Sequence, residues 1–259
     1  MNKMYKTLFL ALICAIAALN VVYAADDDIP TPLESLIVTE NERMNMTQFT
    51  AATETAEAGN VTRLSLYSRS QTKHWQGYYG EITGTITLDD AQNWTMYDWN
   101  NQEPKGEIYA TCNTSGITPD WATVECFDFE TNLRQWEIFY NMTTDGRDNI
   151  NNTFNMTDHP SFGVGRYTIA EDACQSTFTY VNDSWQEQEF REVLLQADGN
   201  ELIYMTIIEQ NDWNNDTDPN GFDNAAHDFQ LIVAEDGSSY DEGEVNQNPT
   251  VYYFYVDLE

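Results

Sequence analysis

The chain has 259 residues, of which 43 are acidic and 11 basic, giving a formal net charge of −32. A surface this acidic repels a phosphate backbone, so nucleic acid is excluded as a class of partner. The hydrophobic content of 41% and the aromatic content of 13% far exceed those of a disordered acidic tail, so we expect the chain to fold.

Residues 1–24 are typical of a secretory signal peptide. Two lysines precede an apolar run that ends at Tyr23, and small residues stand before a cleavage point after Ala24. A retained membrane anchor is the alternative, but the run is short, contains Asn20 and meets three aspartates at once. No later window reaches the ~18 apolar residues of a spanning helix. We therefore expect a secreted, extracellular protein at the cell surface, without a membrane span after cleavage.

Asn-x-Ser/Thr triplets are more frequent than the composition predicts. Chance gives about 3.5 of them, and the excess favours N-glycosylation over a merely Asn- and Thr-rich composition. The candidate acceptors are Asn45, Asn60, Asn93, Asn113, Asn141, Asn151, Asn155, Asn182 and Asn215.

Three cysteines remain after the signal, so one internal disulfide leaves one thiol over. We favour a bond between Cys126 and Cys174, because both lie beside strand-like apolar runs. A bond between Cys112 and Cys126 is the close alternative, since sequence does not determine connectivity. In the favoured pairing, Cys112 is free or joins two molecules.

Residues 25–60 form an acidic leader with one weak strand at "SLIVT", and "TPLESLIVTE" (31–40) is a possible donor strand for a neighbouring molecule. Regular strand signals begin at Val61, so residues 61–259 form one domain. "VTRLSLYS" (61–68) alternates, and "TKHWQGYYGEITGTITL" followed by "NWTMYDW" indicates a hairpin. In the first of these two strands, the isoleucines and leucine of 82–88 share one face and the threonines the other, which is typical of a half-buried strand.

Further strands are expected in the apolar runs that follow. The runs are "GEIYATC", "ATVECFDF", "GVGRYTIA", "STFTYV", "EFREVLLQADGNELIYMTII", "HDFQLIVAEDG" and "TVYYFYVDLE". In "TNLRQWEIFYNM" the apolar residues fit one helical face, with Thr131 as the cap. About ten strands with one or two short helices near 131–152 predict an all-β chain with a single sandwich-like domain.

Several spaced motifs carry a resemblance. "HWQGYYG", "NNTFNMTDHPSFGVG", "DFQLIVAEDG" and the closing "YYFYVDL" resemble a family of uncharacterised secreted surface proteins of archaea, over most of the chain after residue 61. The resemblance implies a surface location and a β-rich domain, and it implies no activity.

The acidic loop "DWNNDTDPNGFDNAAHD" has the opening of a calcium loop. Side-chain oxygens at alternate positions and a following glycine suit a hard cation, but His227 stands where a calcium loop supplies a bidentate glutamate. A polar turn without metal is the alternative. The candidate ligands for calcium or another divalent cation are Asp212, Asp216, Asp218, Asn220, Asp223 and Asp228.

Aromatic residues gather between positions 75 and 99. They suit core packing between sheets first, contact between copies second, and stacking on a glycan third. The residues in question are Trp75, Tyr78, Tyr79, Trp94, Tyr97 and Trp99.

Enzyme motifs recognisable from a single sequence are absent, and the histidines at 74, 159 and 227 are isolated. With 43 acidic residues, a pair of carboxylates for glycoside hydrolysis can be chosen almost anywhere, so such a pair is no evidence for that activity. We therefore expect a non-enzymatic structural or adhesive surface protein, self-associating into a filament or coat by strand exchange and stabilised by divalent cations. The alternative is a carbohydrate-binding module that recognises cell-surface glycans through its aromatics.

Overall fold

The computed structural model describes residues 29–43, 50–101, 104–112, 118–165, 167–182, 185–186, 188–198, 200–209, 219–237 and 249–258. Its regular structure is mostly β, which confirms the predicted all-β class. The strands are β1 (Thr31–Pro32), β2 (Trp75–Gly80), β3 (Gly84–Asp89), β4 (Thr95–Asn101), β5 (Gly106–Thr111), β6 (Glu125–Cys126), β7 (Phe162–Val164), β8 (Tyr167–Ile169), β9 (Ser176–Phe178), β10 (Val181–Asn182), β11 (Trp185–Gln186), β12 (Arg191–Ala197), β13 (Glu201–Ile207), β14 (Phe229–Ala234) and β15 (Tyr253–Leu258). The helices are η2 (Trp121–Thr123), α2 (Leu133–Phe139) and α3 (Ile150–Thr153), and the last two confirm the helices expected near 131–152.

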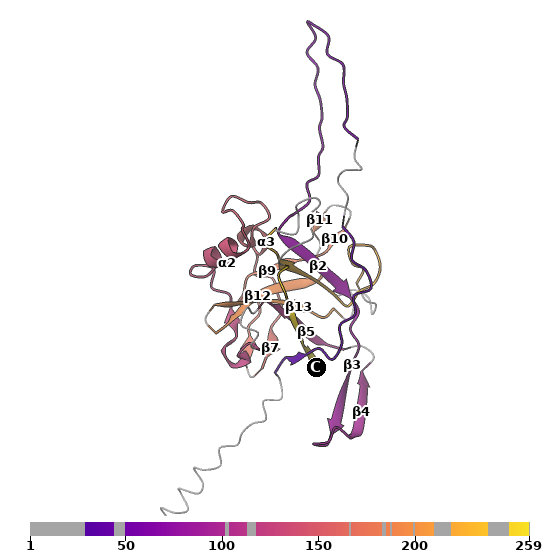
Figure 1. Ribbon diagram of the computed structural model, residues 1–259, viewed down its shortest axis with the longest axis vertical. Coiled ribbons are helices and arrows are strands. Elements are labelled where there is room, and N and C mark those ends of the chain that lie inside the picture. Colours follow the sequence, from indigo (N-terminus) through magenta and orange to yellow (C-terminus); the bar gives the residue numbers. More distant parts are fainter. Residues whose placement is uncertain are drawn as a thin grey trace, which may run out of the picture.

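Seven strands build the main antiparallel sheet, in the order β1-β15-β5-β13-β12-β6, with β9 also pairing with β12 (Figure 1). Its centre is the hairpin β12–β13, in which Leu194 lies opposite Tyr204 and Leu195 opposite Ile203. The apolar runs of these two strands are nearly continuous, and such runs are typical of strands covered on both faces. The structure accordingly buries both faces of this hairpin.

One face of the main sheet is covered by a small second β layer and by the helices. Leu194, Leu202 and Tyr204 from the hairpin share a core cluster with Leu231 and Val233 of β14, which pairs with β2. The helical segments add Tyr140, Met142, Ile150 and Phe154 to the same cluster. The β2–β14 ribbon thus forms the second layer of the sandwich-like arrangement.

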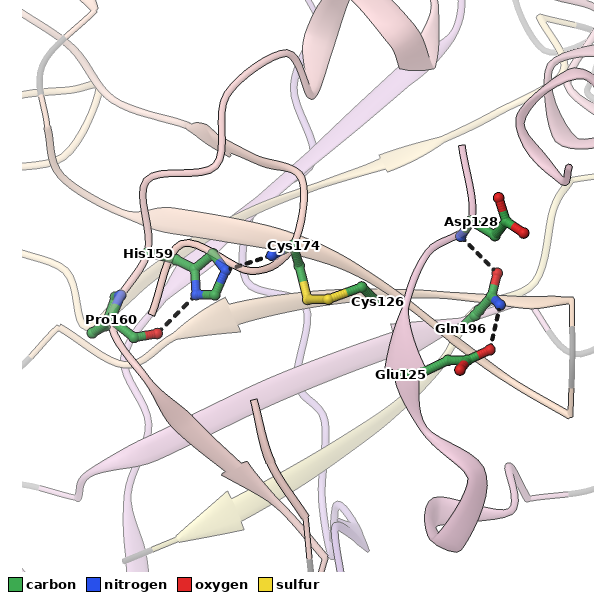
Figure 2. Close-up of a disulfide and its surroundings, with 7 residues drawn as sticks. All are labelled: Glu125, Cys126, Asp128, His159, Pro160, Cys174 and Gln196. Atoms are coloured by element: carbon green, nitrogen blue, oxygen red, sulfur yellow. Dashed lines mark hydrogen bonds between the residues drawn. A yellow bond between two sulfur atoms is a disulfide. The ribbon is translucent and has the colours of Figure 1, made fainter. Parts of the chain in front are cut away.

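The other face is covered by short segments held by the disulfide. Val193, Leu195 and Ile203 of the hairpin pack with Trp121 of η2 and Val164 of β7. The Cys126–Cys174 bond is present, with a Cα–Cα distance of 5.0 Å, so the favoured pairing is confirmed. It links β6 to the segment before β9 (Figure 2), and the strands β6 and β9 both pair with β12.

A buried histidine completes this region. His159 Nε2 accepts the Cys174 N–H at 2.9 Å, and His159 Nδ1 lies 2.8 Å from the Pro160 carbonyl (Figure 2). Nε2 accepts a hydrogen bond and therefore carries no proton. The Pro160 carbonyl can only accept, so the proton of the neutral ring lies on Nδ1. Both ring nitrogens are engaged in structural hydrogen bonds, so this histidine has no nitrogen left for a catalytic or metal site.

Gln196 of β12 fixes the start of α2. Its Oε1 accepts the Asp128 N–H at 2.9 Å, and its Nε2 donates to Glu125 Oε1 at 2.8 Å (Figure 2). The same Oε1 accepts the Asn132 side-chain N–H at 3.0 Å. The expected cap, Thr131, is wrong. The residue at the N-cap is Asn132, and the Thr131 N–H instead donates to the Asp128 carboxylate, which turns the chain one step earlier.

Two predicted strands are wrong. "VTRLSLYS" has no strand, and its apolar side chains are exposed, Val61 and Leu66 among them. Residues 50–74 instead run away from the body and back (Figure 1). "SLIVT" is likewise not a strand, and the leader pairs with β15 through Thr31 and Pro32. Alternation specifies which face a residue takes, but a strand also needs a neighbour for its backbone hydrogen bonds.

None of the helices in the described residues has both the length and the apolar character required to span a bilayer.

Candidate functional site

Hairpin β3–β4 projects from the body below the main sheet (Figure 1). Its turn is built by Asp90, whose Oδ1 accepts the N–H groups of Gln92 and Trp94, each at 2.9 Å. Asn93 takes a left-handed φ of 62°, a conformation that asparagine tolerates better than most residues. The turn and the second strand of the hairpin expected from "TKHWQGYYGEITGTITL" and "NWTMYDW" are therefore confirmed, but the expected first strand is interrupted at residues 81–83, so that β2 pairs with β14 and only β3 pairs with β4.

The register sorts the side chains of this hairpin by polarity. Ile86 pairs with Trp99 and Leu88 with Tyr97, so these four residues share one face. On the opposite face, Thr87 pairs with Asp98, beside Thr85. We call the four-residue surface of Ile86, Leu88, Tyr97 and Trp99 the apolar hairpin face.

This face is open to solvent. The exposed fractions are 43% for Ile86, 49% for Leu88, 56% for Tyr97 and 51% for Trp99. The expectation of a half-buried strand at 82–88 is therefore wrong, because no layer of the described chain covers β3. A two-stranded hairpin alone is marginally stable in water, and an exposed cluster of large apolar side chains is typical of a contact surface.

The base of the hairpin is attached firmly to the body. The Ile82 N–H donates to Asp228 Oδ2 at 2.6 Å, and Ile82 packs with Leu33 and Leu258 around a third apolar cluster. A Cβ atom added at Gly84 would collide with the Leu258 side chain. Glycine therefore permits the close approach that sets the direction in which the hairpin projects.

The aromatic residues between 75 and 99 divide into two groups. Trp75 packs edge-on against Tyr204 and donates Nε1–H to the Asp148 carbonyl at 2.6 Å, and Tyr78 packs edge-on against Phe254. These two belong to the core, as the leading interpretation expects. Tyr79 is 38% exposed and contacts Phe222 and His227, while its hydroxyl donates to Glu40 at 3.2 Å.

The remaining aromatic residues all lie on the hairpin. Trp94 at the turn is 74% exposed. The rings of Tyr97 and Trp99 have centroids 4.6 Å apart and planes inclined at 61°, so together they form a ridge rather than one flat platform. Sequence reasoning grouped all six aromatics and missed Ile86 and Leu88. The signal that points to Ile86 and Leu88 is the strict alternation of apolar and polar residues in a strand for which the sequence offers no recognisable covering layer.

Half of the proposed metal ligands can be placed. Asp228 is committed to the Ile82 N–H, and Asp223 Oδ1 accepts from the Ala225 N–H and lies 3.0 Å from His227 Nε2. Asn220 forms a backbone bridge with Ala226. Asp212, Asp216 and Asp218 lie outside the described residues, and within those residues no group of three or more ligands gathers. The calcium site stays a prediction.

The predicted glycosylation sites that can be placed are all on the surface. Asn60, Asn93, Asn141, Asn151 and Asn155 are exposed. The side chain of Asn182, and all of Asn45, Asn113 and Asn215, lie outside the described part. Exposure is necessary for a glycan to be attached, so the glycosylation prediction retains its basis at these five positions.

The third cysteine is in the core. Cys112 is free and 4% exposed, with its Sγ 3.1 Å from the Tyr140 hydroxyl. Tyr140 in turn lies 2.8 Å from the hydroxyl of Tyr252, which donates to the Ala234 carbonyl at 2.7 Å. Burial raises the pKa of the Cys112 thiol. A neutral thiol enclosed in this way cannot reach a second molecule, so Cys112 gives no support to a covalent link between copies.

The apolar hairpin face consists of hydrocarbon and aromatic side chains. No carboxylate is among its four side chains, and Asp98 lies on the opposite face. Comparison of the chain with protein-family models, with curated proteins and with solved structures gave no match.

Proposed function

We propose that this protein is a secreted, N-glycosylated structural or adhesive component of a cell surface, without enzymatic activity, whose copies contact one another through the apolar hairpin face. The observation that carries the proposal is the exposure of Ile86, Leu88, Tyr97 and Trp99 on one side of a projecting hairpin. The signal-like N-terminus and the exposed sequons support the location, and the resemblance described above supports an archaeal source.

A second copy is the partner that this face fits best. With a net charge of −32, two copies repel each other unless their contact excludes carboxylates. The apolar hairpin face is uncharged and lies on a hairpin that projects away from the body (Figure 1), so two such faces can meet about a two-fold axis with the acidic surfaces kept apart. Divalent cations would further reduce the repulsion between copies.

The test is a matched pair of lysine substitutions on the two faces of the hairpin. Ile86→Lys places a charge in the proposed contact, and we expect association to weaken about tenfold or more, since a buried unpaired charge costs well over 1.4 kcal/mol. Thr87→Lys adds the same charge on the polar face and serves as the control. Sedimentation equilibrium of the processed chain, with and without calcium, measures both. A parent protein that stays monomeric at every concentration would refute the proposal.

Recognition of a cell-surface glycan is the second candidate, because Trp94 and Trp99 are exposed. Sugar faces stack on exposed aromatic rings. A glycan array probed with the parent protein and with Trp99→Ala separates the two candidates. Binding that Trp99→Ala abolishes, in a protein that remains monomeric, would favour the glycan.

A further inference from the structure

The first described residues form a short clip on the edge of the main sheet. Thr31 pairs with Val256 and Pro32 with Tyr255, and the Thr31 hydroxyl donates to the Val256 carbonyl at 3.3 Å. On either side of this pairing, two apolar side chains anchor the segment. Ile29 packs against the cluster that contains Tyr255, and Leu33 packs against the cluster that contains Val256. We call residues 29–33 the N-terminal clip.

The clip holds only part of the β15 edge. The ladder between the clip and β15 covers two of the six residues of that strand, Tyr255 and Val256. Pro32 has no N–H and cannot donate to the ladder, which is typical of an edge strand. Tyr253, farther along β15, is 43% exposed. The pairing is therefore short enough to open without disturbing the central hairpin β12–β13.

The chain that follows the clip is mostly exposed, and Glu40 within it accepts a hydrogen bond from the Tyr79 hydroxyl. Residues 34–43 and 50–70 are exposed and contain neither strand nor helix. The stretch 34–74 reaches roughly 130 Å when extended, at about 3.3 Å per residue. A long connection also lowers the effective concentration of the clip at its own edge, which reduces the advantage of the internal pairing over pairing with a neighbour.

We propose that the N-terminal clip is exchanged between copies, so that residues 29–33 of one molecule occupy the β15 edge of the next. The fit needs no new complementarity, because the same residues already occupy that edge within one chain. Exchange retains each of these contacts, so its cost is confined to linker entropy and to bringing two copies together. The internal pairing and the exchanged pairing are then close in free energy, and concentration decides between them.

Reciprocal exchange closes at two copies, whereas one-way exchange from clip to edge continues from copy to copy. The apolar hairpin face makes a two-fold contact, and the two contacts together would extend into a filament or coat. This extension rests on the proposed function, whereas the exchange itself does not. The clip and the hairpin meet at one apolar cluster, since Leu33 and Ile82 both pack there.

The experiment uses variants of the full secreted chain that each add one cysteine to the three already present. Thr31→Cys and Val256→Cys carry different affinity tags and are co-expressed, so a covalent bond between tags forms only when the clip of one copy pairs with the edge of another. We expect a disulfide-linked product of twice the monomer mass on non-reducing gels that carries both tags. Its yield should increase with protein concentration, because exchange is bimolecular.

The double variant, Thr31→Cys with Val256→Cys in one chain, is the geometric control. An internal bond in the double variant, with no linked product from the co-expressed single variants, would show that the clip stays on its own edge and would overturn the exchange. Absence of any bond in both samples would overturn it as well, because the clip then pairs with no edge. Each variant expressed alone controls for linkage between like cysteines. Repeating the co-expression with Ile86→Lys in both chains separates the two proposals, since the linked product should persist when contact through the hairpin face is lost.

Discussion

The protein contains two antiparallel hairpins of similar length with opposite surroundings. In β12–β13 the side chains of both faces are buried, and Leu194, Leu195, Ile203 and Tyr204 have no exposed surface. In β3–β4 the corresponding apolar residues are about half exposed. The first hairpin is covered on one side by the β2–β14 ribbon and the helices, and on the other by the segments around the disulfide.

The difference in burial between the two hairpins shows what the apolar pattern of a strand specifies. The nearly continuous apolar runs of β12 and β13 require two covering layers, and the described chain supplies both. The alternating pattern of β3 and β4 requires one layer, and the described chain supplies none. An alternating strand is therefore compatible with a cover that comes from another molecule, and the contrast between the two hairpins is the physical basis of the proposed self-association.

The largest effect on the free energy of unfolding is expected at the disulfide, which holds segments that cover the buried hairpin. Replacing Cys126 and Cys174 together by serine removes a bond that closes a sequence separation of 48 residues. The free energy of unfolding should fall by about 4 kcal/mol, because the unfolded chain regains the entropy of that loop. Urea unfolding followed by near-ultraviolet circular dichroism measures the change.

The control for this prediction is Cys112→Ser, which also removes a thiol but no covalent bond. Its hydroxyl can still bond to Tyr140, so the loss should be about 1 kcal/mol. Equal losses in the two variants would contradict an effect that comes from the cross-link.

Replacing one leucine by alanine in each hairpin compares the two hairpins most directly. Leu194→Ala leaves a cavity in a fully buried position and should lower the free energy of unfolding by about 3 kcal/mol. Leu88→Ala, at a position 49% exposed, should change it by less than about 0.5 kcal/mol, yet weaken association measured by sedimentation. If Leu88→Ala destabilised the isolated molecule as much as Leu194→Ala, the hairpin face would be part of the core.

How much of this followed from sequence varies from element to element. The runs of β12, β13 and β14 and the turn at Asp90 were predictable, because their patterns depend on local spacing and on residues that favour turns. The failure at 61–68 has a different origin. Its alternation equals that of β3, and only the presence of β4 as a paired neighbour, which is a tertiary fact, distinguishes them.

The candidate site was predictable only in part. The aromatic residues were recognisable, but Trp75 and Tyr78 were indistinguishable from Tyr97 and Trp99 until the register separated core from surface. The short β1 pairing was also beyond reach, since two residues carry no periodicity. Its position depends on Ile29 and Leu33 finding separate clusters at one sheet edge.

The buried hairpin also contains a carboxyl group whose pKa is shifted by its buried surroundings. Glu192 is fully buried, its Oε2 accepts the Ile232 N–H at 2.8 Å, and within the described residues its Oε1 has no hydrogen-bond partner. Burial raises the pKa of Glu192 well above its ordinary value, and the Ile232 N–H opposes this only in part. The native protein therefore keeps this proton to a higher pH than the unfolded chain does.

The sign of the effect on stability follows from this. Below the pKa that Glu192 has in the unfolded chain, its contribution to the free energy of unfolding is present in full. The contribution is lost as the pH increases toward the pKa of Glu192 in the native state, because only the unfolded chain releases the proton in that interval. Glu192→Gln keeps an acceptor for Ile232 and should flatten this decline, so its gain over the parent grows with pH. Asp98→Asn, on the exposed hairpin, controls for the loss of one negative charge. Parallel stability curves for Glu192→Gln and the parent would contradict the prediction.

The base of the exposed hairpin tests the direction of the hairpin more than the stability of the fold. Gly84 has no left-handed φ, so Gly84→Ala acts only through the collision of its methyl group with Leu258. That side chain can move, and the free energy of unfolding should fall by about 1 kcal/mol. Any tilt of the hairpin that helps to accommodate the methyl group redirects its face, so association through the apolar hairpin face should weaken more than this figure implies. Adding Leu258→Ala removes the collision and should restore association, measured by sedimentation at matched concentrations. If the double variant associates as poorly as Gly84→Ala alone, the direction of the hairpin is not what aligns the two faces.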